Sequence, residues 1–127
     1  MIKLTILVTG GRDFSDETLL RRLIFDAAGT GLESHEIRLV HGNARGADKL
    51  AARIGIEAGF DVVPYPANWK DHGLAAGPMR NTFMFVDSKP DVVIAVPGGT
   101  GTNDMVKKVK AAIKRGKNVS LIYHRDT

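Results

Sequence analysis

The 127-residue sequence contains no cysteine. This absence excludes disulfide bonds, thiolate-bound zinc and catalysis by a cysteine nucleophile. Aromatic residues are also scarce, at 6% of the chain, which argues against a surface that stacks successive nucleic-acid bases. No apolar run reaches the roughly 18 residues that a membrane span needs, and the N-terminal residues do not resemble a signal peptide. We therefore expect a cytoplasmic protein without a membrane partner.

The net charge is mildly positive, at +4, which favours anionic ligands. Many of the basic residues lie between Lys107 and Lys117. A solvated helix face is the ordinary interpretation of such a segment, and a nucleic-acid contact is the alternative. The length suits a single domain over residues 1–127 with a core of its own.

Five apolar strand-like segments alternate with amphipathic or alanine-rich segments along the chain. Such alternation predicts an α/β fold with a parallel sheet and right-handed crossovers. We predict a Rossmann-like three-layer fold whose five strands are arranged in the order 3-2-1-4-5. The expected strands are 3–9, 37–40, 61–65, 92–96 and 118–123, the expected helices are 17–28, 47–58, 78–87 and 103–114, and residues 67–78 and 124–127 are expected to be a long loop and a short tail.

The segment 92–105 reads as a buried strand, a glycine-rich turn and the start of a helix. Its glycines permit positive φ and the close approach of a ligand. The helix N-terminus offers free N–H groups and a partial positive charge, which suit a phosphate. The spacing matches neither the dinucleotide fingerprint nor the P-loop, so a simple tight connection is the alternative. Candidates for the helix N-cap are Thr100, Thr102, Asn103 and Asp104.

Two further glycine turns follow the first and second strands, at residues 10–12 and 41–46. In the predicted sheet the strand order reverses between strands one and four, and ligands bind at the carboxyl ends of strands near such a reversal. We therefore expect the three turns to converge. The candidate ligand-binding residues are Gly10, Gly11, Arg12, Gly42, Arg45, Arg80, Asn81, Gly98, Gly99, Thr100, Gly101 and Thr102.

Several charged residues in these turns have two interpretations each. Arg12 is suited to clamp a phosphate, or to pair with Asp13 or Asp16. Arg45 is either a second phosphate contact or a surface arginine. Asp48 is suited to accept a hydrogen bond from a ribose hydroxyl, but capping of the second helix is the favoured interpretation.

The histidine and tryptophan candidates point more to structure than to chemistry. His41 ends a strand and has no partners at metal-ligand spacing, so we expect a structural role, no metal and no cofactor. Trp69 either packs the loop 67–78 onto the body or stacks on a bound base. Arg80 and Asn81 stand near a helix start and form a candidate phosphate- or sugar-binding pair.

Taken together, these motifs resemble the YspA/YAcAr-type branch of the SLOG superfamily, which includes the Lonely-guy phosphoribohydrolases and the Smf/DNA-processing-A proteins. The resemblance covers about residues 4 to 122 and implies a Rossmann-like fold that binds a nucleotide or nucleotide-derived ligand. The branch is common in phage and bacterial genomes. The motifs that carry the resemblance are Val8–Asp13, His41–Asp48, Ala67–Trp69, Ala76–Asn81 and Pro97–Val106.

The resemblance also bears on catalysis. Lonely-guy enzymes cleave the N-glycosidic bond of nucleoside 5′-monophosphates and carry Pro-Gly-Gly-x-Gly-Thr-x-x-Glu, with an Arg-Lys pair on the preceding helix. Here the first six residues are present at 97–102, but Met105 takes the glutamate position and Asn81 replaces the lysine. Phosphate binding therefore carries over better than hydrolysis. An alternative is a phosphoribohydrolase that uses Arg80 and Asp104.

The expected partner is a nucleotide-like small molecule. A DNA-binding module is a third interpretation, by analogy with the DNA-processing relatives and from the basic helix. The Lonely-guy relatives dimerise, and Phe83, Met84 and Phe85 offer apolar surface for self-association; a homodimer and a monomer both remain open.

Overall fold

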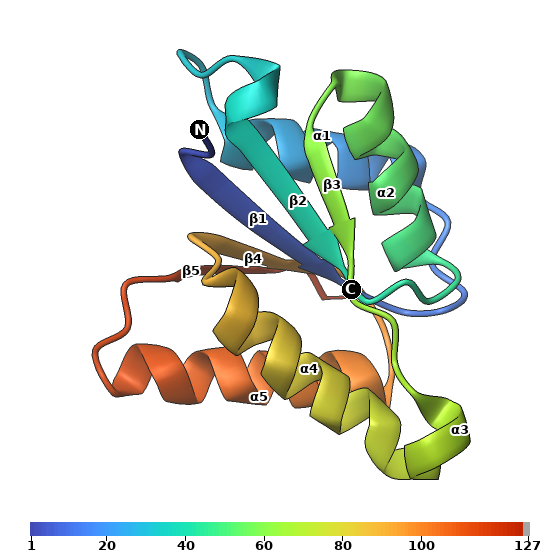
Figure 1. The fold of residues 1–127 in the computed structure, drawn as a ribbon. Helices are drawn as coiled ribbons and strands as arrows, with labels where there is room; N and C mark the ends of the chain where they lie inside the picture. Colours follow the sequence, from blue (N-terminus) through green and yellow to red (C-terminus); the bar gives the residue numbers. More distant parts are fainter. Residues whose placement is uncertain (126–127) are drawn as a thin grey trace.

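The chain folds around a five-stranded parallel sheet (Figure 1). The structure is a computed structural model and describes residues 1–125; the last two residues of the predicted tail lie outside the described part. The strands are β1 (Leu4–Thr9), β2 (Ile37–His41), β3 (Asp61–Pro64), β4 (Val92–Ala95) and β5 (Ser120–Tyr123). Their order is β3-β2-β1-β4-β5, and all neighbouring pairs are parallel. The predicted topology is confirmed.

Helices cover both faces of the sheet, which gives the predicted three layers (Figure 1). One face carries α1 (Glu17–Ala28) and α2 (Ala47–Ala58), and the other carries α4 (Ala76–Ser88) and α5 (Thr100–Lys114). The short helix α3 (Trp69–His72) lies beyond the carboxyl ends of the strands, and the 3-10 turns η1 (Ser34–Glu36) and η2 (Gly73–Ala75) complete the chain. Within the described residues, no helix combines the length and apolar character needed to cross a membrane.

The central strand β1 supplies both halves of the core. Alternate side chains of a strand point to opposite faces of the sheet. Ile6 and Val8 pack in the cluster under α1 and α2, whereas Leu7 packs with Met84 of α4 and Met105 of α5. All five side chains are essentially inaccessible to solvent, as expected for a strand covered on both faces.

The segment predicted as a long loop contains helical structure. The side chain of Asn68 caps α3, because its Oδ1 accepts a hydrogen bond from the N–H of Asp71 at 3.2 Å. Helix α4 then begins at Ala76 rather than at Pro78. A four-residue helix shows no hydrophobic periodicity, so the pattern of apolar residues could not have revealed it.

Helix α5 begins at Thr100, earlier than the predicted start at Asn103. Its N-cap is Gly99, and no side chain caps it. The predicted capping by Thr100, Thr102, Asn103 or Asp104 is therefore wrong, because these residues already lie inside the helix.

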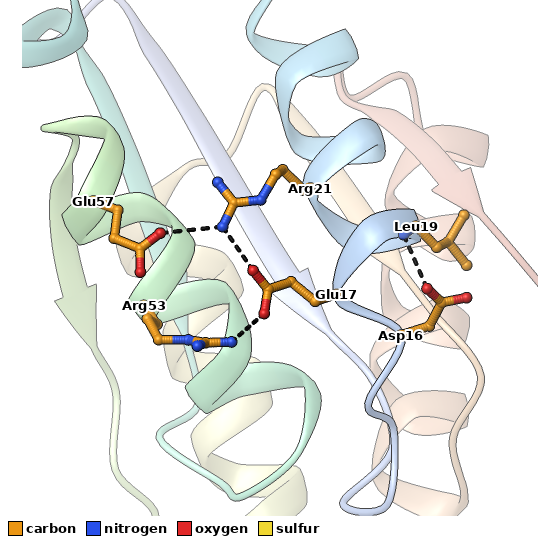
Figure 2. A network of polar contacts seen from close by, with 6 residues as sticks. All are labelled: Asp16, Glu17, Leu19, Arg21, Arg53 and Glu57. Carbon is orange, nitrogen blue, oxygen red and sulfur yellow. Dashed lines mark hydrogen bonds and ion pairs between the residues drawn. The ribbon is translucent and has the colours of Figure 1, made fainter.

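A surface network joins α1 to α2 (Figure 2). Glu17 accepts hydrogen bonds from Arg21 at 2.8 Å and from Arg53, and Arg21 also contacts Glu57 at 3.1 Å. The hydrogen bond from Arg21 and the nearby Arg53 lower the pKa of Glu17. Beside this network Asp16 caps α1 by accepting the N–H of the third helical residue at 3.1 Å. The two helices are thus linked outside the apolar core.

Gly46 packs against the turn that follows β1. Its backbone has φ +77, and a Cβ at this position would overlap the carbonyl oxygens of Gly11 and Arg12. Gly31 also has positive φ, at +100, but a Cβ there would meet no atom within 4 Å. Substitution of these two glycines therefore distinguishes the cost of backbone strain from the cost of lost close packing.

We predict that Gly31→Ala lowers the free energy of unfolding by about 1 kcal/mol through backbone strain alone. Gly46→Ala should lower it by about 2 kcal/mol more, because overlap with the neighbouring backbone adds to the strain. Urea unfolding followed by circular dichroism measures both. Equal losses in the two variants would contradict the packing described for Gly46.

Candidate functional site

The predicted convergence of the glycine turns is observed, and they line a cleft with two lobes at the carboxyl ends of the strands. The main lobe has a volume of about 920 Å³, and the side lobe a volume of about 390 Å³. Of the predicted ligand-binding residues, nine line the main lobe: Gly10, Gly11, Arg12, Arg80, Asn81, Gly99, Thr100, Gly101 and Thr102. Predicted residues of the side lobe are Gly42 and Arg45, together with Arg12 and Arg80, which line both lobes.

Gly98 is the one predicted ligand-binding residue that lines neither lobe. A Cβ on Gly98 would overlap the hydroxyl of Thr102 and lie 2.6 Å from the amide nitrogen of Gly11. Gly98 therefore allows two turns to touch. Gly99 and Gly101 differ, because a Cβ on either would meet no atom within 4 Å.

The N-terminal turn of α5 borders the main lobe through Thr100, Gly101 and Thr102. The first N–H groups of a helix lack partners within the helix, and its N-terminus carries a partial positive charge. Asn103 is the first residue of α5 whose N–H reaches back to the preceding turn, at 3.0 Å from the carbonyl of Gly99. The N–H groups before it suit an anion.

Arg80 on α4 holds the walls of the cleft together. Its guanidinium donates to the carbonyl of Gly42 and, at 3.2 Å, to that of Tyr65, which follow β2 and β3. Its Nε donates to Oδ1 of Asn81 at 3.0 Å. Burial lowers the pKa of Arg80. Arg80 and Asn81, the predicted binding pair, therefore line the cleft and also make hydrogen bonds within the protein.

Asp104 also lines the main lobe, but its carboxylate is engaged. Lys108 lies 2.6 and 2.5 Å from its two oxygens, and Asn81 donates to Oδ2 at 3.0 Å and to the carbonyl of Gly101 at 3.1 Å. Met105, at the position of the Lonely-guy glutamate, is fully buried in the core. Asp104 is therefore the acidic side chain of α5 that reaches the cleft.

The carboxylate of Asp48 holds the backbone of the turn after β2. It is buried, and its Oδ2 accepts the N–H groups of Gly42 at 3.1 Å and Ala44 at 3.2 Å. Burial raises the pKa of Asp48 to about 6. The favoured prediction that Asp48 caps α2 is wrong, because the N-cap is Gly46, which makes no side-chain cap. The loop after β2 lies over the first turn of α2, so its backbone N–H groups, rather than those of the helix, donate to the Asp48 carboxylate.

His41 has a structural role, as predicted. Its ring is buried, and Nδ1 accepts the N–H of Asn43 at 3.0 Å. Burial, with a contribution from the nearby charges of Lys49 and Arg80, lowers the pKa of His41 to about 4. The histidine therefore holds the turn as a neutral ring.

Arg12 and Trp69 meet at the boundary of the two lobes. The guanidinium carbon of Arg12 lies 5.5 Å from the centroid of the Trp69 ring, which is a cation–π arrangement. The predicted pairing of Arg12 with Asp13 or Asp16 is wrong: among the ion pairs of residues 1–125, Asp13 instead pairs with Arg45 at 3.3 Å. Both partners are largely exposed, so this pair contributes only about 0–1 kcal/mol.

Trp69 packs the segment 67–78 onto the body of the protein, which was one of its two predicted roles. Its neighbours in the cleft were not predicted from the sequence. A Cβ on Gly77 would lie 3.2 Å from the indole ring, so the ring packs directly on α4. Leu74, Gly77 and Pro78 also line the main lobe. Leu74 is 94% exposed, which is unusual for a leucine. The motifs Ala67–Trp69 and Ala76–Asn81 were the sequence signals near these residues.

Asp48 and His41 make opposite contributions to the pH dependence of stability. The pKa of Asp48 is raised from 3.8 to about 6, so its contribution to stability falls as pH rises through this window. The pKa of His41 is lowered from 6.5 to about 4, so its contribution rises as pH rises. In Asp48→Asn only the histidine contribution remains. Urea unfolding between about pH 4.5 and about pH 7, which spans the window of these pKa values, should therefore show a steeper rise in stability than in the wild type.

The exposed carboxylate of Asp26 on α1 offers a matched control. Asp26→Asn should leave the wild-type pH profile in place. An Asp48→Asn profile parallel to that of the wild type would contradict the description of Asp48 as a buried carboxyl group.

Comparisons with known proteins agree with this architecture. The model of the YspA, cpYpsA-related SLOG family matches residues 4–72. The Gene 61 protein of Mycobacterium phage D29 is 35% identical over 116 residues, which cover 84% of this chain and 89% of that protein. Acetylglutamate kinase of Bacteroides fragilis matches locally, with 41% identity over 56 residues, or 44% of this chain and 20% of the kinase.

The fold has a counterpart among solved structures. The X-ray structure of TM1055, a structural genomics target, superposes with a TM-score of 0.60 and 16% sequence identity, over 97% of this chain and 92% of that one. At this identity the likeness concerns the fold. The family match over more than half of the described chain and the phage relative identify the chain itself: it belongs to the YspA, cpYpsA-related SLOG family.

Proposed function

We propose that this protein binds a nucleotide or nucleotide-derived ligand in the main lobe, with a phosphate over the N-terminus of α5. The observation that carries the proposal is the open space above Gly99 and Gly101, where a Cβ would meet no atom. The helix start at Thr100 borders this space. A phosphate there would accept hydrogen bonds from N–H groups that have no partner in the helix.

The remaining walls of the main lobe suit the sugar of a nucleotide. Asp48 and Asp104 both border the lobe, and carboxylate oxygens accept hydrogen bonds from hydroxyl groups. Arg12 and Arg80 border it as well and balance the charge of a phosphate. A ligand with one phosphate and a ribose therefore matches the groups that this lobe offers.

Membership of the SLOG family supports a nucleotide-related ligand, since the relatives that the sequence resembles act on nucleotides. The phage relative is named only as a gene product. The kinase match spans a fifth of that enzyme and carries no argument for phosphoryl transfer here.

A negative charge placed above the α5 N-terminus tests the phosphate position. Gly99→Asp introduces a carboxylate where the fold leaves space, and Gly99→Asn is its neutral counterpart. Two like charges about 4 Å apart repel by about 4 kcal/mol at an effective dielectric constant near 20. We expect Gly99→Asp to weaken the binding of adenosine 5′-monophosphate by at least about tenfold relative to Gly99→Asn, measured by isothermal titration calorimetry.

Equal affinities in the two variants would place the phosphate elsewhere. Gly99 is preferable to Arg80 for this test, because Arg80 holds the carbonyls of Gly42 and Tyr65. Loss of Arg80 would disturb the walls as well as any ligand contact.

Hydrolysis of the N-glycosidic bond is the second candidate function, favoured by the position of Asp104 on the main lobe. Two observations weigh against it: Asp104 is paired with Lys108, and Met105 lies in the core. We therefore expect incubation with adenosine 5′-monophosphate to release no adenine, as measured by chromatography. Release by the wild type that is lost in Asp104→Asn would establish hydrolysis instead.

A further inference from the structure

The side lobe of the cleft differs in charge from the main lobe. Its lining includes three arginines, Arg12, Arg45 and Arg80, and no aspartate or glutamate. The main lobe has two of these arginines and three aspartates, Asp13, Asp48 and Asp104. The side lobe is therefore the more positive end of the cleft, because the carboxylates that line the cleft line only the main lobe.

Arg45 is available to an anion in the side lobe. Its partner Asp13 is held at 3.3 Å, and the two side chains are 73% and 96% exposed. An ion pair so open to solvent is weak. A ligand phosphate that offers several acceptor oxygens can replace it without leaving a buried charge behind.

The turn that carries Arg45 is rigidly held. Asp48 accepts two of its N–H groups, and His41 accepts a third from Asn43. Lys49 donates its ammonium to Oδ1 of Asn43 at 2.8 Å and its backbone N–H to the carbonyl of Ala44 at 3.2 Å. A turn fixed in this way presents Arg45 with little loss of backbone entropy on binding.

Arg12 forms the passage between the two lobes. It lines both of them, and its guanidinium lies over the Trp69 ring. A guanidinium carries several N–H donors, so a cation–π contact leaves donors available for hydrogen bonds. Arg12 can therefore contact an anion while Trp69 fixes its orientation.

We propose that the side lobe binds a second anionic group of the ligand, held by Arg12 and Arg45. The ligand class is then a nucleotide whose two anionic groups are separated by at least a sugar, rather than a simple nucleoside monophosphate. The inference rests on the proposed binding of a nucleotide phosphate in the main lobe. The two lobes, about 920 Å³ and about 390 Å³ in volume, together offer room for a ligand larger than a mononucleotide, since typical ligand pockets are about 300–1,000 Å³.

The test compares one and two anionic groups on the same scaffold. Isothermal titration calorimetry measures the affinity for adenosine 5′-monophosphate and for the 5′-phosphorylated dinucleotide pApA. We expect the wild type to bind pApA at least about tenfold more tightly, as one charge-assisted contact provides. In Arg45→Gln the ratio of the two affinities should fall toward one, with Arg12 as the remaining contact. Arg22→Gln, which removes an exposed arginine of α1 outside either lobe, should keep the wild-type ratio.

The outcomes separate this inference from the proposed function. If adenosine 5′-monophosphate binds and Gly99→Asp weakens it, but pApA binds no more tightly, the side-lobe inference fails and the main-lobe proposal stands. The same conclusion follows if Arg45→Gln and Arg22→Gln retain equal preferences for pApA. If neither nucleotide binds, both proposals fail.

Discussion

The backbone of Gly11 joins the segments that form the cleft. Its N–H donates to the carbonyl of Pro97 at 2.9 Å, and its carbonyl accepts from the N–H of Ala47 at 3.1 Å. These two bonds connect the turn after β1 to the turn after β4 and to the start of α2. They require the three turns to approach at backbone distance, which is why Gly46 and Gly98 have no room for a side chain.

A partly buried polar layer, formed by Asp48 and Arg80, supports this backbone contact. Arg80 and Asp48 bind opposite ends of one peptide segment: Arg80 donates to the carbonyl of Gly42, and Asp48 accepts the N–H of the same residue. Buried charged groups are unfavourable unless they are paired and hydrogen-bonded. Here the backbone itself supplies the partners, so the layer holds β2, α2 and α4 in register around the cleft.

The sequence predicted the sheet and its topology because those features follow from local signals. Apolar runs mark the buried strands, and glycines mark the turns at their ends. The right-handed crossover rule fixes only the handedness of the connections, and the order 3-2-1-4-5 was predicted as the arrangement of a Rossmann-like fold. The convergence of the turns at residues 10–12, 41–46 and 97–102 follows from the same order.

The finer features of the site depend on contacts between distant segments, and local patterns do not encode these. Asp48 has the position and residue type of a capping group, but its carboxylate accepts hydrogen bonds from the turn after β2, at Gly42 and Ala44, instead of capping the helix. Asp13 lies next to Arg12 in sequence but pairs with Arg45 of the turn after β2. The division into two lobes depends on where α3 places Trp69, and α3 has no periodic signal.

The glycines in and behind the cleft fall into two classes with different constraints on their evolution. Gly46 and Gly98 are fixed by the fold, since any side chain would meet the backbone or side chain of a neighbouring segment. Gly99 and Gly101 face open space, so the folded chain itself tolerates larger residues there. Changes at these two positions would separate folding from the proposed binding of a phosphate, and a relative with bulky residues there would keep the architecture without the proposed phosphate site.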